Sequence, residues 1–196
     1  TLFRHPPFLA ATVAALATGG GIIALMSYMP GFLGTVLGID ALGAALLLFG
    51  WSATSVVTAL LARRLPASLS GRTQLAVGLV GVAIGMLMLT GLSENASWPR
   101  LLPGLLVAGV ASGVLNAALG REAVASVPAG RGMGSGANNT ARYVGSAIGV
   151  TVVAVVAVPA GSGAGGLVQG WNTAALVTAA ISVLGAVVVS FSRAGR

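Results

Sequence analysis

Six apolar stretches, each long enough to cross a bilayer, constrain this chain more than any other feature. They cover residues 8–29, 41–62, 74–92, 101–119, 136–158 and 171–191. A membrane-spanning helix needs about 20 predominantly apolar residues. Five of the stretches contain no Asp, Glu, Lys, Arg or His, and the remaining one contains Arg142. The sequence therefore predicts an all-α membrane protein, with six transmembrane helices in a single domain over residues 1–196 that lies in the lipid bilayer.

The composition excludes the soluble alternatives. Only 7% of the 196 residues are charged and the mean hydropathy is +0.98, whereas soluble domains carry about 25% charged residues. A set of buried helices in a large soluble core would need amphipathic helices to cover it, and the sequence offers none. A net charge of +7 would suggest nucleic-acid binding in a soluble protein, but we expect no nucleic-acid partner for a chain embedded in lipid.

The distribution of arginine predicts the orientation. If the N-terminus is cytoplasmic, the cytoplasmic side receives eight of the ten arginines, and the outer side receives Arg100 with Asp40 and Glu94. Basic loops stay in the cytoplasm, so we expect both termini on that side of the cell membrane. The Arg-only, Ala- and Gly-rich composition is typical of a bacterial chain. The eight cytoplasmic arginines are Arg4, Arg63, Arg64, Arg72, Arg121, Arg131, Arg193 and Arg196.

Few residues are available for catalysis or metal binding. Cysteine is absent, His5 is the only histidine, and the acids are Asp40, Glu94 and Glu122. Nucleophilic and metal-dependent catalysis need bases or ligands that this set does not supply, so we expect neither an enzyme nor a metal or cofactor site. No carboxylate lies inside an apolar stretch, so the chain shows no proton-binding group of its own within the membrane.

Arg142 is the candidate functional residue with the strongest signal, because an Arg near the bilayer centre costs about 2.5–3.5 kcal/mol on insertion scales. It lies about 9 Å into its predicted helix. One interpretation is that it faces a water-filled cavity and binds an anionic or polar group. The alternative is that it reaches back to the membrane surface, or pairs with Glu122 or with a helix C-terminus.

Other polar or aromatic residues inside the stretches are further candidates for the wall of a cavity. Helical spacing places Asn138 or Asn139 on the face of Arg142, and Asn116 lies in the fourth stretch. Tyr28 and Trp51 belong to the same group. For each of them, packing against other helices or lipid is the alternative interpretation.

Small residues and boundary residues predict how the helices pack. Pro30 and Pro103 are expected to mark helix ends, and Trp98 and Trp171 are expected to anchor the outer membrane surface. Pairs of glycines four residues apart allow close approach of two helices. Such pairs occur at Gly34/Gly38, Gly81/Gly85, Gly109/Gly113, Gly132/Gly136 and Gly145/Gly149.

One segment carries a resemblance to a known family. Residues 128–150 read PAGRGMGSGANNTARYVGSAIGV, which resembles a G-x-x-S-G-x-x-N-x-x-R-x-x-G-x-x-x-G stretch of multidrug transporters in the major facilitator superfamily. The basic loop with Arg63, Arg64 and Arg72 is also similar, although the Asp common in that loop is missing here. The closest likeness is to the fourteen-helix drug:proton antiporter branch. The matching residues are Gly132, Ser135, Gly136, Asn139, Arg142, Gly145 and Gly149.

The resemblance covers the whole chain and implies the C-terminal six-helix half of a carrier that operates by alternating access. It implies a missing N-terminal half as partner, a small hydrophobic or cationic substrate exported from the cell, and protons as the coupling ion. The alternative is a non-transporting membrane remnant or an assembly subunit. The cavity-lining residues that it implies are Tyr28, Trp51, Asn116, Asn139 and Arg142, and the charge contacts at the cytoplasmic loops are Arg63, Arg64, Arg72, Glu122 and Arg131.

Overall fold

The computed structural model describes residues 6–62, 64, 69–125, 127, 131–157 and 163–192. Arg63 lies outside these residues, and the side chain of Arg131 is likewise not described. The described residues are helical and contain no strand. Six helices are long and apolar enough to cross a membrane. The predicted fold class, an all-α membrane protein with six transmembrane helices, is confirmed.

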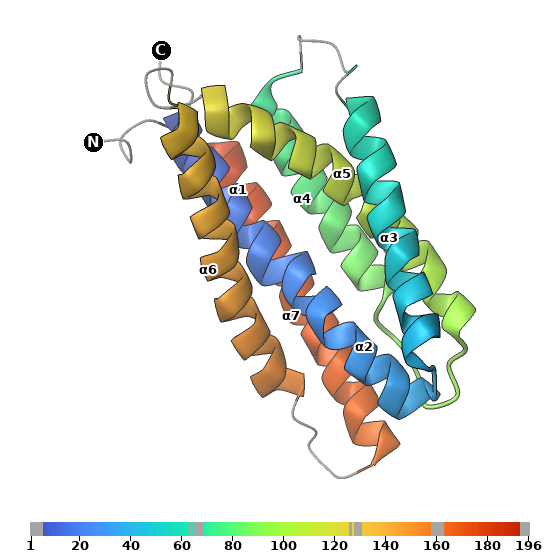
Figure 1. The fold of residues 1–196 in the computed structure, drawn as a ribbon. Helices are drawn as coiled ribbons and strands as arrows, with labels where there is room; N and C mark the ends of the chain where they lie inside the picture. The colour runs from blue at the N-terminus through green and yellow to red at the C-terminus, as the bar shows by residue number, and fades with distance from the viewer. Residues whose placement is uncertain are drawn as a thin grey trace.

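The first span is continuous and has three parts: α1 (Pro6–Thr18), a π-helical turn η2 (Gly19–Ile23) and α2 (Ala24–Leu37). It is followed by α3 (Ala41–Ala62) and α4 (Gly71–Met88). A short 3₁₀ turn η3 (Trp98–Leu101) leads into α5 (Leu102–Ala125). The chain continues through α6 (Arg131–Ala157) and α7 (Ala164–Phe191), as Figure 1 shows.

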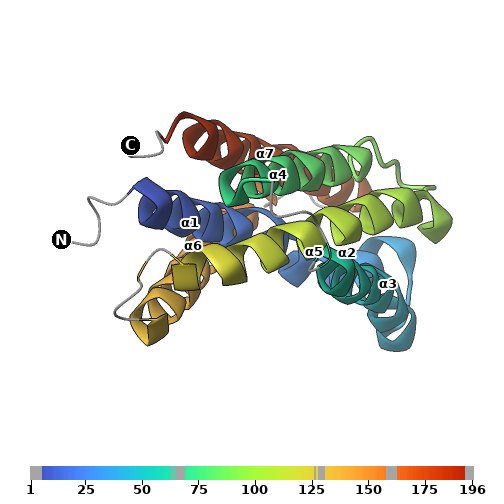
Figure 2. The same ribbon diagram turned by 90° about the horizontal axis from the view of Figure 1, so that it is seen from above.

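The helices form two layers that meet where α4 packs directly on α5, and α1 lies between the layers toward one end. Seen from above in Figure 2, α4 and α7 lie along one side and α3, α5 and α6 along the other, with α1 between. Residues Pro6 and Ser192 meet the start of α4 at one end of the bundle, which we call the terminal end, and the opposite end is the far end. Most residues of the first span are buried, whereas α3 lies at the edge and few of its residues are buried.

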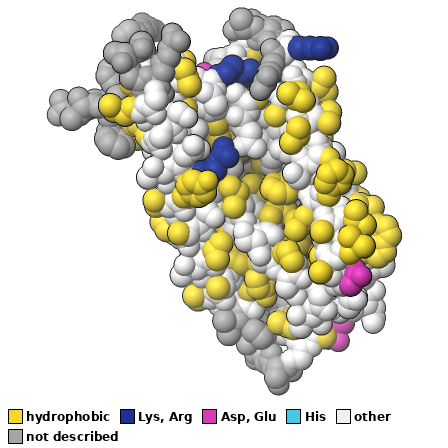
Figure 3. All heavy atoms as spheres, viewed as in Figure 1, with side chains coloured by type: hydrophobic (Ala, Val, Ile, Leu, Met, Phe, Trp, Pro, Cys, Tyr) yellow, Lys and Arg dark blue, Asp and Glu magenta, His cyan; other side chains and the backbone are white. Residues whose placement is uncertain are grey.

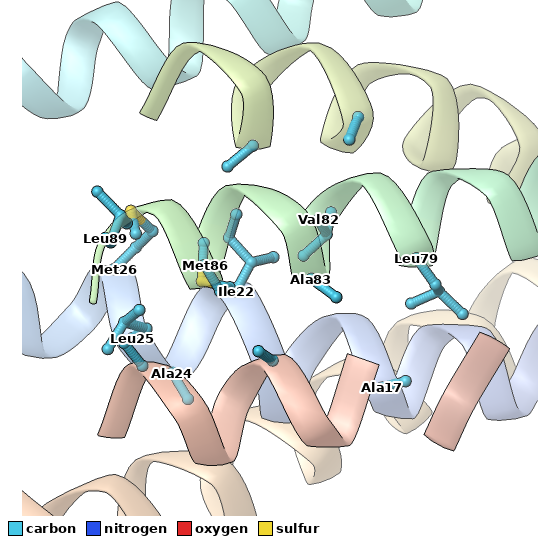
Figure 4. Packing of buried hydrophobic residues seen from close by; sticks show 14 of the residues in the cluster. Ala17, Ile22, Ala24, Leu25, Met26, Leu79, Val82, Ala83, Met86 and Leu89 are labelled. Atoms are coloured by element: carbon cyan, nitrogen blue, oxygen red, sulfur yellow. The ribbon is translucent and has the colours of Figure 1, made fainter. Parts of the chain in front are cut away.

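The core is built from the first span, α4, α5 and α7. Figure 4 shows Ile22 and Met26 of the first span pointing toward Met86 and Leu89 at the end of α4. These side chains are at most 5% exposed. The hydrophobic effect contributes little to contacts between helices in lipid. Dispersion contacts between densely packed side chains therefore hold these helices together.

Trp171 is part of this core, and the prediction that it anchors the membrane surface is wrong. It is fully buried, and its indole Nε1 donates a hydrogen bond of 2.8 Å to the carbonyl oxygen of Leu89. Its ring stacks on Phe32, with centroids 4.5 Å apart, and more loosely on Tyr28 at 6.4 Å. Trp171 therefore joins α7 to the first span and to the end of α4. Trp98, in contrast, is half exposed at the far end.

Pro30 does not end the first helix, as the sequence had suggested. It lies inside α2, which continues to Leu37. The helix ends at Gly38, whose φ of 62° is left-handed and whose N–H bonds the carbonyl of Leu33, an arrangement that favours glycine. Membrane helices tolerate an internal proline when neighbouring groups satisfy the freed backbone. Pro103, the second residue of α5, does lie at a helix start.

Three of the five glycine pairs lie at helix contacts. A Cβ on Gly85 would lie 2.7 Å from the Cβ of Ala108 on α5, and a Cβ on Gly109 would lie 2.7 Å from the carbonyl oxygen of Trp51 on α3. A third close contact joins α6 to the first span, because a Cβ on Gly145 would overlap the backbone of Leu16. The pairs Gly34/Gly38 and Gly132/Gly136 make no such contact with another helix among the described residues.

We expect Gly145→Ala to lower the free energy of unfolding by about 1–3 kcal/mol, because the added methyl group would overlap the Leu16 backbone and overpack the contact. Gly136→Ala on the same helix is the matched control, since no described atom lies within 4 Å of its Cβ position. Thermal unfolding of both variants in detergent is the measurement. Equal melting temperatures would show that α6 does not depend on this close approach.

Candidate functional site

A hydrogen bond between Arg142 and Asn116 is the centre of the candidate site. The Nη2 of Arg142 on α6 donates to the Oδ1 of Asn116 on α5 over 2.9 Å. Arg142 is partly exposed, and its Nε is buried with no hydrogen-bond partner among the described residues. The two helices are thereby joined inside the apolar part of the bundle by one neutral and one charged side chain.

The backbone at Arg142 is held by the glycines of the π-helical turn. A Cβ on Gly19 would overlap the carbonyl oxygen of Arg142 and would lie 2.6 Å from the amide nitrogen of Ser146. The first span therefore packs directly on the α6 backbone at this level. Gly145 makes the same approach possible from the other side of the contact. The position of the Arg142 guanidinium thus depends on the close helix contact at Gly19 and Gly145, which have no side chains.

Three more buried polar atoms, on α3, α5 and α6, have no described partner. Asn138 precedes Arg142 by one helical turn, and its Oδ1 is unpaired. Ser112 precedes Asn116 by one turn on α5, and its Oγ is unpaired. On α3, the Nε1 of Trp51 is unpaired as well. More than nine tenths of buried polar groups in proteins are hydrogen-bonded, so this clustering on α3, α5 and α6 is a feature of the site.

An apolar groove of about 460 Å³ lies beside Trp51, between the first span and α3. The backbone of Trp51 lies against α5 at Gly109, which precedes Asn116 by seven residues, a rise of about 10 Å along α5. The groove is large enough to accommodate an apolar group of moderate size. It is lined by Ile23, Met26, Ser27, Ala45, Leu48, Phe49, Trp51 and Ser52.

The structure brings together some of the candidate cavity residues and separates others. Asn116 and Arg142 are in contact. Asn138 is buried next to them along α6, whereas Asn139 is exposed. Tyr28 stacks on Trp171 instead. Ser112 was not among the sequence candidates, and its spacing of four residues from Asn116 was the signal available for finding it.

No described carboxylate pairs with Arg142. The alternative in which Glu122 neutralises it is wrong, because Glu122 lies against Gly71 at the start of α4. Asp40 accepts a hydrogen bond of 2.8 Å from the N–H of Gly43 near the start of α3, and Glu94 lies exposed near Gly165. In Figure 3 dark-blue side chains occur at the terminal end and again lower down, among yellow apolar side chains, while the magenta acidic side chains lie away from the lower one.

The terminal end is fastened by two other arginines. Arg121, in the last turns of α5, donates from Nη1 to the carbonyl of Ala62 on α3 over 3.2 Å and from Nη2 to Oε1 of Gln74 on α4. Arg72 donates to the carbonyl of Ser192 at the end of α7. These cations lie at the C-terminal ends of α3 and α7, where the helix dipoles are negative. Arg64 is exposed.

The comparisons with known proteins agree on one family. The model of the Major Facilitator Superfamily matches residues 1–150. A curated protein of Streptomyces coelicolor, named "Probable actinorhodin transporter", is 32% identical over 159 residues. That alignment covers 78% of this chain but 27% of the relative, so the chain spans about a quarter of the length of the curated relative that it matches.

We expect the Arg142–Asn116 bond to contribute about 0.6–2 kcal/mol to folding, as polar bonds between membrane helices do. A double-mutant cycle with Asn116→Leu and Arg142→Met measures this coupling from free energies of unfolding in mixed micelles. Thr151→Val on α6 is the control, because its hydroxyl bonds only the carbonyl of Ala147 in its own helix. A coupling energy of zero would show that the two side chains are not joined in the folded protein.

Proposed function

The chain belongs to the Major Facilitator Superfamily, and from this premise we propose that it forms the C-terminal six-helix half of a proton-coupled exporter of small hydrophobic compounds. The family resemblance read from the sequence is confirmed, as is the prediction that the chain is not an enzyme, because the superfamily consists of membrane transporters. Its placement in the fourteen-helix branch remains a prediction.

The length of the relative agrees with a carrier that is longer than this chain. The named transporter from Streptomyces is about four times as long as the aligned segment. Carriers of this superfamily are built from two six-helix halves around a midplane site. A second half would cover the face on which α3 and α6 expose large apolar side chains, among them Phe49 and Val155.

The observation that carries the proposed function is the partly exposed Arg142, bonded to Asn116 within the apolar core of the bundle. An intramembrane charge is costly and, in membrane proteins, marks a substrate or ion pathway. The bond links α5 to α6, two helices that the family resemblance places at the cavity. In this proposal the Arg142–Asn116 pair faces the substrate when the two halves rock.

The coupling ion and the orientation complete the proposal. Glu122, in the last turn of α5 at the terminal end, is the one described acid within a membrane-spanning helix, and Asp40 and Glu94 lie outside these helices. We therefore assign the proton-binding carboxylates of the carrier to its other half. The arginine-rich terminal end is cytoplasmic under the positive-inside rule. The protein then lies in the cell membrane of a bacterium with Arg64, Arg72 and Arg121 at the inner surface and Arg100 at the outer surface.

An efflux assay tests the function. Cells that express the complete reading frame are loaded with a panel of neutral and charged hydrophobic dyes, and we expect export of at least one dye that stops when a protonophore collapses the gradient. Arg142→Gln should lower the initial rate at least tenfold. Arg100→Gln should not, because Arg100 is exposed and bonds only the Met88 carbonyl at 3.2 Å. Unchanged export by Arg142→Gln would remove Arg142 from the mechanism.

The orientation has its own test, since the chain contains no native cysteine. We expect Asn95→Cys to react with a membrane-impermeant maleimide added outside intact cells, and Arg64→Cys to react only after the membrane is opened. Both side chains are exposed in the structure, so protection by burial does not confuse the result. The reverse labelling pattern would contradict a cytoplasmic terminal end.

A further inference from the structure

We infer that the Arg142 site selects a substrate that carries an oxyanion, such as a carboxylate, on an apolar body, and disfavours cations. This inference rests on the proposed function and narrows the substrate class beyond it. The family resemblance had implied a hydrophobic or cationic substrate. The charges that the structure places around the site indicate the opposite sign.

The first argument is the missing counter-charge. Arg142 is cationic and bonds a neutral amide, and each of the three acids of the chain has another location, at the two ends of the bundle. A cation held in a low-dielectric region attracts an anion and repels a second cation far more strongly than in water. Within this half of the carrier, a bound oxyanion would neutralise Arg142, whereas a cationic substrate would add a second positive charge beside it.

The second argument is the surplus of donors. Guanidinium and indole N–H groups donate hydrogen bonds and do not accept them, and the Nε of Arg142 and the Nε1 of Trp51 are both buried without a described acceptor. Ser112 adds a hydroxyl that can donate or accept, so that Asn138 Oδ1 is the single unpaired group in this set that only accepts. A ligand that complements this set must be rich in acceptors. Carboxylates supply several acceptor lone pairs and bind guanidinium groups with strong charge-assisted bonds.

The third argument is the room for an apolar body. The groove beside Trp51 is lined mainly by aliphatic and aromatic side chains, including Met26 and Phe49. The backbone of Trp51 contacts α5 at Gly109, two helical turns before Asn116. The site therefore suits a hydrophobic molecule whose charged end reaches Arg142.

Two dyes with the same xanthene ring system and opposite charge test the inference. The complete protein in nanodiscs of neutral phosphatidylcholine is titrated against fluorescein, which is anionic at pH 8, and against cationic rhodamine 123, with fluorescence polarisation as the readout. We expect fluorescein to bind at least tenfold more tightly. Arg142→Gln should remove that preference, Arg142→Lys should restore part of it, and Arg100→Gln should leave both affinities unchanged.

Several outcomes would overturn the inference while the efflux assay tests the proposed function separately. Tighter binding of rhodamine 123, or binding of neither dye, would contradict an anion-selective site. Unchanged fluorescein affinity in Arg142→Gln would mean that Arg142 pairs with another part of the carrier. Loss of fluorescein binding when phosphatidylglycerol is added would assign the oxyanion to a lipid headgroup and overturn the substrate proposal.

Discussion

Close backbone approach at glycine is the constraint on which this structure depends. In lipid, apolar side chains gain little by leaving the solvent, so helices associate through dispersion contacts and a few polar bonds. The contacts of α6 with the first span, of α5 with α3, and of α4 with α5 all pass through glycines whose Cβ positions are occupied by a neighbouring helix. In such a bundle the helices can shift little relative to one another, because backbone atoms rather than adaptable side chains set each contact.

The glycine contact between the first span and α6 also positions the charged residue of the candidate site. Gly19 lies against the carbonyl of Arg142, so the π-helical turn of the first span fixes the segment of α6 that carries the charge. From there the guanidinium reaches Asn116 on α5. A polar pair, an apolar groove beside Trp51 and several unpaired donors are therefore held on different helices by packing that contains almost no polar groups. The residues that pack the helices are apolar and the residues of the candidate site are polar, but the packing sets where the polar residues lie.

Hydropathy was sufficient to predict the fold class, because lipid leaves the backbone few options other than helices. Local residue identity was less informative at the ends. Pro30 suggested a helix end, but α2 continues past it. Trp171 suggested a surface anchor, but its ring lies between helices. A sequence does not reveal whether a residue near a helix end faces lipid or protein. The importance of Arg142 and Asn116 followed from their polarity alone. Their pairing depends on which faces of α5 and α6 meet, and Arg121 was missed because α5 extends past the predicted end at 119.

The arginine contacts at the terminal end have a mechanical consequence. Arg121 ties the ends of α3, α4 and α5 together, and Arg72 ties the start of α4 to the end of α7. Four helices are thus coupled through α4 at one membrane surface. A displacement of any one of these helix ends is transmitted to the other three through these hydrogen bonds. Such coupling favours rotation of the bundle as a rigid body over sliding of single helices past one another.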